Sequence, residues 1–218
     1  MHIKLEASDL NKRILEICKT SRIIAVLTIE DENVAIPLAQ AILAGGLPVL
    51  EITLRTPAAL EAIRRMTSVK GAIIGAGTVL NSKDVEAAKL AGAKFAVSPG
   101  ITDEIVDACE NFSLPILGGV SSVSESMRML NQGYNVLKFF PAEVSGGVKA
   151  LQAINGPLPQ VLFCPTGGIN NKNALDYLTE PNVISVGGSW IATKELIKKK
   201  DWNKVFNLAK NACELIKK

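Results

Sequence analysis

The stretch Ile23–Ile29, IIAVLTI, is apolar at six of its seven positions and is too short to form a buried helix. A run of this kind, rich in Ile and Val, is typical of a strand covered on both faces, as in a parallel sheet. Seven further short apolar runs follow at intervals of about 20 to 25 residues: Val49–Leu54, Ala72–Ala76, Phe95–Val97, Pro115–Leu117, Val136–Phe140, Val161–Cys164 and Val183–Val186. The sequence therefore predicts eight parallel strands.

Segments with helical spacing and end signals lie between these runs. Ser82 is a predicted N-cap, and Ser122-x-x-Glu125 has the pattern of a capping box at the start of another helix. Met127 and Met129 lie in that second helix, and we expect them to pack in the core. The chain thus alternates strands with helices.

Two more helices flank this alternation, one before the first strand at about residues 8–20 and one after the last at about residues 202–216. Alternation without a linker or a shift in composition predicts one domain over residues 1–218, an α/β fold that closes as a (β/α)8 TIM barrel with an extra N-terminal helix and a C-terminal helix. The main alternative is a doubly wound open sheet.

Residue counts exclude several kinds of chemistry. The 218 residues include one histidine, His2, which argues against a Ser-His-Asp triad, a Cys-His pair and a histidine-ligated metal site. The four cysteines, at positions 18, 109, 164 and 213, form no C-x-x-C pair, so neither a zinc ribbon nor a dithiol redox site is expected. Any chemistry must therefore come from Lys, Arg, Glu, Asp, Thr or Cys.

The distribution of charge and of apolar residues indicates which kinds of partner, nucleic acid or membrane, are expected. Residues 190–218 hold 8 of the 24 Lys+Arg but only 3 of the 21 Asp+Glu, so the net charge of +3 arises in the C-terminal helices. We interpret the run Lys198-Lys199-Lys200 as a solvated helix end and its turn, and nucleic acid is not the expected partner. The sequence contains neither a signal peptide pattern nor an apolar run of membrane-spanning length, so we expect a soluble cytoplasmic protein that binds no membrane.

Lys138 is the most informative residue, because it interrupts the apolar run Val136–Phe140. Burying an ammonium group is costly, and a desolvated lysine that loses its proton is a good nucleophile for a carbonyl. Alternation along the strand directs Lys138 into the barrel and its neighbours Leu137 and Phe139 toward the helices. The alternatives are a lysine that extends to the rim or one held in a structural ion pair.

Glu51, Thr53 and Arg55 share one parity in and just after the run Val49–Leu54. Glu51 and Thr53 are therefore expected to face the interior, and Arg55 to stand at the strand's end. Glu51 could act as general acid and base, and Arg55 could hold a substrate carboxylate. The alternative is that Glu51 and Arg55 neutralise each other.

Two glycine-rich turns follow the last two predicted strands. One contains Thr166, Gly167 and Gly168, and the other contains Gly187, Gly188 and Ser189. Backbone N–H groups at such turns can cradle an anion, and TIM barrels often bind phosphate after strands 7 and 8. Gly75-Ala-Gly77-Thr78 lacks the spacing of a dinucleotide motif, so we interpret it as a turn that presents Thr78 to the site.

These segments together resemble those of a known family. LEITLRT (Leu50–Thr56), GAGTVLN (Gly75–Asn81), LKFFPAE (Leu137–Glu143), FCPTGGI (Phe163–Ile169) and GGSW (Gly187–Trp190) are similar to the bacterial 2-keto-3-deoxy-6-phosphogluconate (KDPG) and 4-hydroxy-2-oxoglutarate (KHG) aldolases. The resemblance covers about residues 23–190. It implies a homotrimeric class I aldolase of the Entner–Doudoroff pathway that uses no metal or other cofactor.

The resemblance also implies roles for single residues. It makes Lys138 the Schiff-base lysine and Glu51 the proton shuttle. Contacts to the pyruvate part of the substrate fall on Arg55, Thr78, Phe140 and Thr166, and phosphate contacts fall on Gly167, Gly168, Gly187, Gly188 and Ser189.

The predicted reaction is reversible cleavage of KDPG to pyruvate and glyceraldehyde 3-phosphate, and also of KHG to pyruvate and glyoxylate. The expected ligands are therefore a phosphorylated 2-keto acid and pyruvate. The alternatives are a sister aldolase for 2-keto-3-deoxy-6-phosphogalactonate and a non-catalytic barrel that binds sugar phosphates.

Overall fold

The computed structural model describes residues 6–215, so the lone histidine, His2, and the last predicted helical position, Ile216, lie outside the described residues. All paired strands are parallel. The strands are β1 (Ile23–Leu27), β2 (Val49–Thr53), β3 (Ile73–Gly77), β4 (Phe95–Val97), β5 (Ile116–Leu117), β6 (Gly119–Val120), β7 (Val136–Phe139), β8 (Leu162–Pro165) and β9 (Val186–Gly188). The predicted parallel α/β fold is confirmed.

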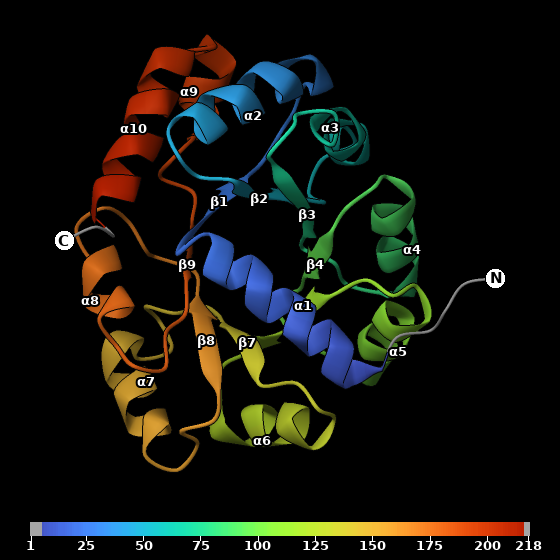
Figure 1. Ribbon diagram of the computed structural model, residues 1–218, viewed down its shortest axis with the longest axis vertical. Helices are drawn as coiled ribbons and strands as arrows, with labels where there is room; N and C mark the ends of the chain where they lie inside the picture. The colour runs from blue at the N-terminus through green and yellow to red at the C-terminus, as the bar shows by residue number, and fades with distance from the viewer. Residues whose placement is uncertain (1–5, 216–218) are drawn as a thin grey trace.

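Ten α-helices and one 3-10 helix, η1 (Glu32–Val34), lie among residues 6–215. The α-helices are α1 (Ala7–Thr20), α2 (Ala35–Ala44), α3 (Ala59–Met66), α4 (Ser82–Leu90), α5 (Asp103–Asn111), α6 (Val123–Asn131), α7 (Gly147–Asn155), α8 (Ala174–Leu178), α9 (Lys194–Lys199) and α10 (Trp202–Leu215). Figure 1 shows α1 crossing in front of the strands, with the other helices around them. None of the described helices is long and apolar enough to cross a membrane.

The strands form two sheets, of order β5-β4-β3-β2-β1-β9 and β6-β7-β8. Two isolated parallel bridges, Phe163 to Val183 and Thr166 to Gly187, join β8 to the segment that contains β9. At the other junction Gly118 separates β5 from β6, and its carbonyl accepts a hydrogen bond from the Lys138 N–H at 2.9 Å. The sheets are therefore linked on both sides.

Two of the eight predicted strands differ in detail from the structure. The run at 115–117 continues past Gly118 as β6, because residues 116–117 pair with β4 whereas residues 119–120 pair with β7. The run at 183–186 becomes a regular strand only at Val186. Its first part bonds to β8 through the Ile184 N–H, and its last residue bonds to Arg22 through the Val186 N–H.

Side chains on the two faces of the strands belong to two separate apolar clusters. One face contributes an interior cluster, in which strand residues pack with Ile14 and Cys18 of α1: Ile24, Val49, Phe95, Val97, Leu117, Val136 and Cys164. The other face, which includes Leu137 and Phe139, packs in the cluster that holds the helices. Because residues from six strands meet in one small cluster, the sheets curl around a common interior.

Helix α1 closes one end of this interior. The side-chain oxygen of Asn11 accepts hydrogen bonds from the N–H groups of Asn135 and Val136, at the start of β7, at 3.0 and 3.1 Å. The amino ends of the strands therefore face α1. Their carboxyl ends open on the opposite side.

Two predictions about helices were wrong, and one was confirmed. The N-cap of α4 is Asn81, whose side chain accepts from the Asp84 N–H, and the adjacent Ser82 bonds Glu104 instead. Met129 is buried, but Met127 is 52% exposed, because only one of two residues separated by two positions on a helix can face the core. The capping box of Ser122 and Glu125 is present at the start of α6.

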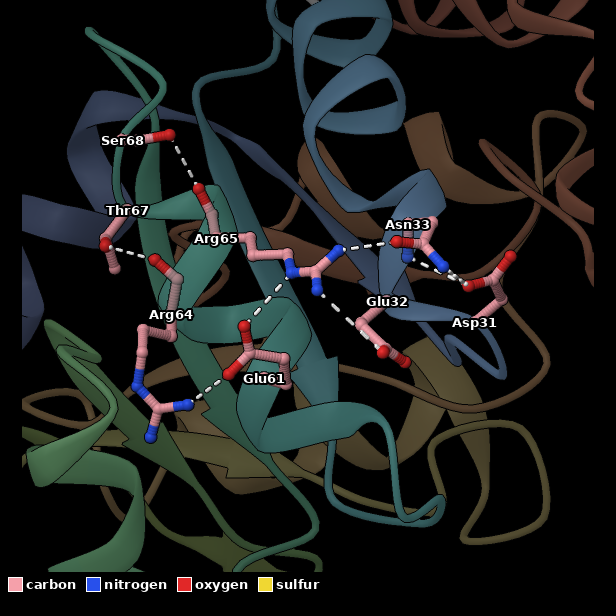
Figure 2. Close-up of polar contacts among 8 residues, drawn as sticks. All are labelled: Asp31, Glu32, Asn33, Glu61, Arg64, Arg65, Thr67 and Ser68. Atoms are coloured by element: carbon pink, nitrogen blue, oxygen red, sulfur yellow. Dashed lines mark hydrogen bonds and ion pairs between the residues drawn. The ribbon is translucent and has the colours of Figure 1, made fainter.

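Polar contacts on the surface fix η1 to α3 (Figure 2). Arg65 donates to Glu61 on its own helix at 3.0 Å and to Asn33 at 2.8 Å, and Arg64 also pairs with Glu61. The Asp31 side chain caps η1 by accepting from the Asn33 N–H. Exposed ion pairs of this kind contribute little stability, but these contacts engage Arg64 and Arg65 outside the predicted site.

Candidate active site

Lys138 of β7 and Glu51 of β2 meet inside the curled sheet. The Lys138 Nζ lies 3.7 Å from the Glu51 Oε1, and the two side chains are only 6% and 4% exposed. The ammonium also lies 5.2 Å from the centroid of the Phe140 ring. Lys138 therefore does not extend to solvent at the rim. Burial of such a pair is costly, and buried ion pairs are a weak source of stability.

Arg55 does not neutralise Glu51. It stands exposed two residues beyond the end of β2, and among residues 6–215 it has neither an ion pair nor a hydrogen bond. Four of the other arginines are engaged: Arg22 with the Leu178 carbonyl, Arg64 and Arg65 with Glu61, and Arg128 with Asp103. The Arg55 guanidinium is thus free to bind an anion.

Gly77, the last residue of β3, makes room for the Glu51 side chain. A Cβ at this position would lie 2.2 Å from the Glu51 Oε1 and 2.6 Å from its Cγ, so no other residue fits without movement. Thr78 follows with φ of 60°, a left-handed conformation that non-glycine residues rarely adopt. Backbone strain of this kind occurs often at functional sites.

A pocket of about 150 Å³ opens at the carboxyl ends of the strands. Eight of the predicted site residues line it: Arg55, Phe140, Thr166, Gly167, Gly168, Gly187, Gly188 and Ser189. A second pocket of about 260 Å³ adjoins it and shares Val26, Arg55 and Ser189. Lys138, Glu51 and Thr78 do not line either pocket, but Phe140 connects Lys138 to the smaller one.

The two glycine turns bring backbone to the wall of this pocket. Gly167 and Gly168 have φ of 102° and 81°, and within the described chain their N–H groups donate to no protein acceptor. Gly187 packs on Thr166, because a Cβ there would lie 2.4 Å from the Thr166 Oγ1. Unpaired N–H groups in a turn are suited to bind an oxyanion.

Sequence reasoning missed Glu143 and Tyr177, which support the first of these turns. The Tyr177 hydroxyl, from a fully buried side chain on α8, donates to the Glu143 carboxylate. Burial and this contact raise the pKa of Tyr177 above its ordinary value. The Glu143 stem packs on Gly168, where a Cβ would lie 2.4 Å from its Cγ. Glu143 ends the segment LKFFPAE, and a carboxylate just past the end of a strand could have been predicted as a site residue. Tyr177 lies inside a helix, where no sequence pattern indicates a role at the site.

Two other residues at the site were also not predicted. Val26 of β1 lines both pockets, and an apolar residue in an apolar strand gives no signal in the sequence. Cys164 is in register with Lys138 on the neighbouring strand β8. Burial raises the pKa of the Cys164 thiol to about 11, although the nearby Lys138 opposes the shift. Cys164 is therefore a neutral neighbour of the lysine.

The described residues contain no group of three or more His, Cys, Asp or Glu side chains arranged to hold a metal ion.

Comparison with known proteins identifies related sequences. The family model for KDPG and KHG aldolases matches residues 14–208. The 2-dehydro-3-deoxy-phosphogluconate aldolase of Pseudoalteromonas atlantica is 51% identical over 191 residues, which are 87% of this chain and 89% of that protein. The KHG/KDPG aldolase of Escherichia coli is 45% identical over 199 residues, covering 91% of this chain and 93% of that protein.

Solved structures give the same result. The KDPG aldolase of Legionella pneumophila, with pyruvate captured as a covalent carbinolamine intermediate, superposes with a TM-score of 0.87 at 44% identity and covers 95% of this chain and 98% of that one. The KDPG aldolase of Zymomonas mobilis with 3-phosphoglycerate has a TM-score of 0.86 at 44% identity, covering 92% and 95%.

Proposed function

The chain belongs to the KDPG and KHG aldolase family of carbon–carbon lyases, and on this premise we propose that it cleaves KDPG reversibly to pyruvate and glyceraldehyde 3-phosphate. The observation that carries the proposal is the buried pair of Lys138 and Glu51, 3.7 Å apart, beside a pocket lined by Arg55 and two glycine turns. KHG, which yields pyruvate and glyoxylate, is the second proposed substrate.

Lys138 is the proposed nucleophile. Its neutral amine attacks the C2 carbonyl of the substrate to give a carbinolamine, and loss of water leaves an iminium ion. The iminium accepts the electron pair of the C3–C4 bond when that bond breaks, which releases the aldehyde and leaves an enamine. The carbinolamine trapped in the Legionella relative supports this sequence.

Glu51 is the proposed proton shuttle. Its carboxylate lies 3.7 Å from the Lys138 Nζ, beyond direct hydrogen-bonding distance, so we propose that it takes the ammonium proton through one water molecule. It then serves the dehydration of the carbinolamine and accepts the proton of the C4 hydroxyl during cleavage. The same proton returns to C3 of the enamine, after which water hydrolyses the iminium to pyruvate and free lysine.

Arg55 and Thr78 are the proposed contacts for the substrate carboxylate. The Arg55 guanidinium has no competing partner within residues 6–215, so it can form a bidentate ion pair with a carboxylate. Thr78 directly follows Gly77, which packs against Glu51, and its left-handed backbone conformation is typical of residues at functional sites. Phe140 covers Lys138, and Thr166 stands by the aldehyde part of the substrate.

The glycine turns are the proposed phosphate site. Gly167 and Gly168, whose N–H groups have no protein acceptor within the described chain, line the same pocket as Gly187, Gly188 and Ser189. Binding the remote phosphate there orients the carbon chain, so that C2 reaches Lys138 in attack geometry. The Zymomonas relative with 3-phosphoglycerate supports a phosphorylated ligand.

We also propose that residues 1–218 form one domain and that the linked sheets close as a (β/α)8 barrel, with β5 and β6 as a single interrupted strand. The bridges at Thr166 and Val183 and the shared interior cluster support closure. The proposed cytoplasmic location is supported by the absence of disulfides among the four described cysteines.

A homotrimer is the proposed assembly. Exposed apolar side chains after β3, β6 and β7 support an interface at the carboxyl end of the strands, among them Leu80, Val123 and Val144, which is 83% exposed. Light scattering on the purified protein should give about three times the chain mass of 23.2 kDa. A monomer at micromolar concentration would contradict this assembly.

Borohydride reduction in the presence of pyruvate tests the mechanism. Intact-mass analysis should show one reduced pyruvate adduct per chain, and peptide mapping should place it on Lys138. An adduct on another lysine, or none, would refute the assignment. Binding of sugar phosphates without an adduct or turnover would favour the non-catalytic barrel.

Comparison of kcat/KM values for KDPG, KHG and 2-keto-3-deoxy-6-phosphogalactonate identifies the preferred substrate. Purified protein should cleave KDPG more efficiently than KHG, because only KDPG carries a phosphate for the glycine turns. Faster cleavage of 2-keto-3-deoxy-6-phosphogalactonate would favour the sister aldolase. Equal activity on phosphorylated and unphosphorylated 2-keto acids would show that the phosphate site is assigned wrongly.

A further inference from the structure

A pocket of about 640 Å³ lies at the amino ends of the strands, away from the proposed active site. Helix α1 forms one wall, and the segments that lead into β4 and β5 form the other: Lys12, Arg13, Glu16, Ile17, Lys89, Gly92, Ala93, Lys94, Ser113 and Pro115. In Figure 1, α1 crosses close to β4 and α5 at this end of the molecule. The volume falls in the range of small-molecule sites, roughly 300–1,000 Å³.

Cations dominate the lining of this amino-end pocket. Lys12, Arg13, Lys89 and Lys94 face one carboxylate, Glu16, which is already paired with Lys19 at 2.9 Å. Lys12 has a partner as well, Asp9 at 3.5 Å. Within residues 6–215 no carboxylate pairs with the other three cations.

Arg13 is, with Arg55, one of two arginines that have no hydrogen bond or ion pair to the described chain. Arg55 lines the proposed active site, and Arg13 lines the amino-end pocket. A guanidinium presents a planar fork of donors that matches carboxylate and phosphate oxygens. Its lack of a protein partner leaves that fork available to a ligand.

Lys89 lies at the centre of the charge cluster. It is half-buried, and its Nζ donates to the Ser113 carbonyl at 3.1 Å, which fixes the ammonium inside the pocket. Burial lowers the pKa of Lys89, and repulsion from Arg13 and Lys94 lowers it further. Arg13 and Lys94 therefore each lie close enough to Lys89 to repel it, and a bound anion would relieve that repulsion.

The cluster does not reflect a generally basic surface. Residues 1–189, which contain every lining residue, hold 16 Lys+Arg and 18 Asp+Glu, so this part of the chain is acidic overall. Cations gathered in a cavity on an acidic background produce a local positive potential, which concentrates small anions.

We propose that the amino-end pocket binds a small polyvalent oxyanion, a phosphate ester or a polycarboxylate, through Arg13, Lys89 and Lys94. Because these three cations have no carboxylate partner within residues 6–215, a ligand with two or more negative charges matches them best. The ligand rests against backbone at Gly92 and Ala93, and the aliphatic part of Ile17 covers one side. This site is separate from the active-site phosphate cradle, which uses backbone N–H groups at the opposite end.

Lysine footprinting on the full chain tests the proposal, because it reports each end of the molecule separately. The protein is acetylated briefly at constant ionic strength with sodium chloride, inorganic pyrophosphate or citrate, and the rate at each lysine is measured by mass spectrometry. Pyrophosphate should slow acetylation of Lys89 and Lys94 at least about threefold, the slowing that two-thirds occupancy gives. Exposed Lys204 and Lys210 on α10 are internal controls and should not change.

The two anions distinguish the ligand classes. Protection by pyrophosphate alone identifies a phosphate site, and equal protection by citrate identifies a site for polyvalent oxyanions in general. Equal slowing of all exposed lysines, or no protection of Lys89 and Lys94, would overturn the proposal.

A charge reversal at an exposed position gives a second test. Arg13→Glu should abolish the protection of Lys89, whereas Lys210→Glu, a matched reversal on exposed α10, should leave it intact. Circular dichroism and thermal melting verify that both variants are folded. Undiminished protection of Lys89 in Arg13→Glu would also overturn the proposal.

Discussion

The two ends of the strands present positive charge in different ways. At the carboxyl end, Arg55 and two glycine turns line a pocket of about 150 Å³, and within the described chain the N–H groups of Gly167 and Gly168 have no protein acceptor. At the amino end, the side chains of Lys89, Lys94 and Arg13 line a pocket of about 640 Å³. This lining contains a single glycine, Gly92, and no double-glycine turn. Each end contains one arginine without a partner in the described chain.

This difference indicates that the carboxyl end recognises one ligand shape, whereas the amino end accepts anions of several shapes. Backbone N–H groups in a turn are fixed by the fold, so they bind one shape at one place and suit a substrate that must meet Lys138 in attack geometry. Exposed cationic side chains, such as those of Arg13 and Lys94, can adapt to ligands of different shape, and salt screens them more strongly. We therefore expect catalysis to depend on the carboxyl end alone.

The largest effect should follow from Lys138→Ala, which removes the nucleophile. We expect kcat/KM for KDPG to fall by more than about 10⁴-fold, as when the nucleophile of other covalent catalysts is removed. Steady-state assays measure the loss. Lys204→Ala, on exposed α10, is the control and should retain full activity. A kcat/KM for Lys138→Ala within tenfold of the value for the unsubstituted protein would show that the buried pair is not needed for catalysis.

Glu51→Gln should have the next largest effect. It keeps the shape of the side chain but removes the base, and general acid–base catalysis typically contributes about 10²–10⁴-fold. We expect kcat to fall within that range, while borohydride with pyruvate still labels Lys138 slowly. An unchanged kcat would show that Glu51 only compensates the charge of Lys138.

Gly187→Ala tests the glycine turns. The new Cβ would lie 2.4 Å from the Thr166 Oγ1, and overpacking of this kind costs about 1–3 kcal/mol. We expect KM for KDPG to rise about tenfold, equivalent to about 1.4 kcal/mol, with a smaller change for KHG. Gly100→Ala is the matched control, because its Cβ would meet nothing within 4 Å. Equal increases for both substrates would contradict a phosphate-specific role.

Tyr177→Phe should have the smallest effect. It removes the hydroxyl that holds Glu143 against Gly168, so we expect a rise of about two- to fivefold in KM for KDPG, the equivalent of one hydrogen bond of about 0.5–1 kcal/mol, with kcat unchanged. The control is Tyr134→Phe near the amino end, where the lost contact is with Glu110 at 3.4 Å. A comparable KM increase in Tyr134→Phe would indicate general destabilisation.

The parallel α/β fold could be predicted because short apolar runs and capping signals are local features. The run at Ile23–Ile29 contains β1, and Ser122 with Glu125 forms the predicted capping box. The break at Gly118 could not be predicted, because it depends on which neighbour each half of the segment bonds. The predicted N-cap of α4 was wrong by one residue, because Asn81 and Ser82 both have side chains that can cap a helix.

The candidate site was also predictable in part. A lysine in an apolar strand and a glutamate in another were visible in the sequence, and alternation placed both in the interior, where the structure has them 3.7 Å apart. Eight other predicted residues share one pocket. The contribution of Val26 and the contact between Tyr177 and Glu143 were not visible, because they join segments far apart in the chain.

The sequence by itself determined the types and order of the elements and the chemical groups at the strand ends, because periodicity and residue type are properties of neighbours along the chain. Tertiary structure decided which groups meet. It paired Glu51 with Lys138 and not with Arg55, and it gathered Lys89 and Lys94 beside α1. It also left Arg55 and Arg13, at opposite ends, without partners among residues 6–215. Curling of the sheet sets these distances, and no local pattern encodes them.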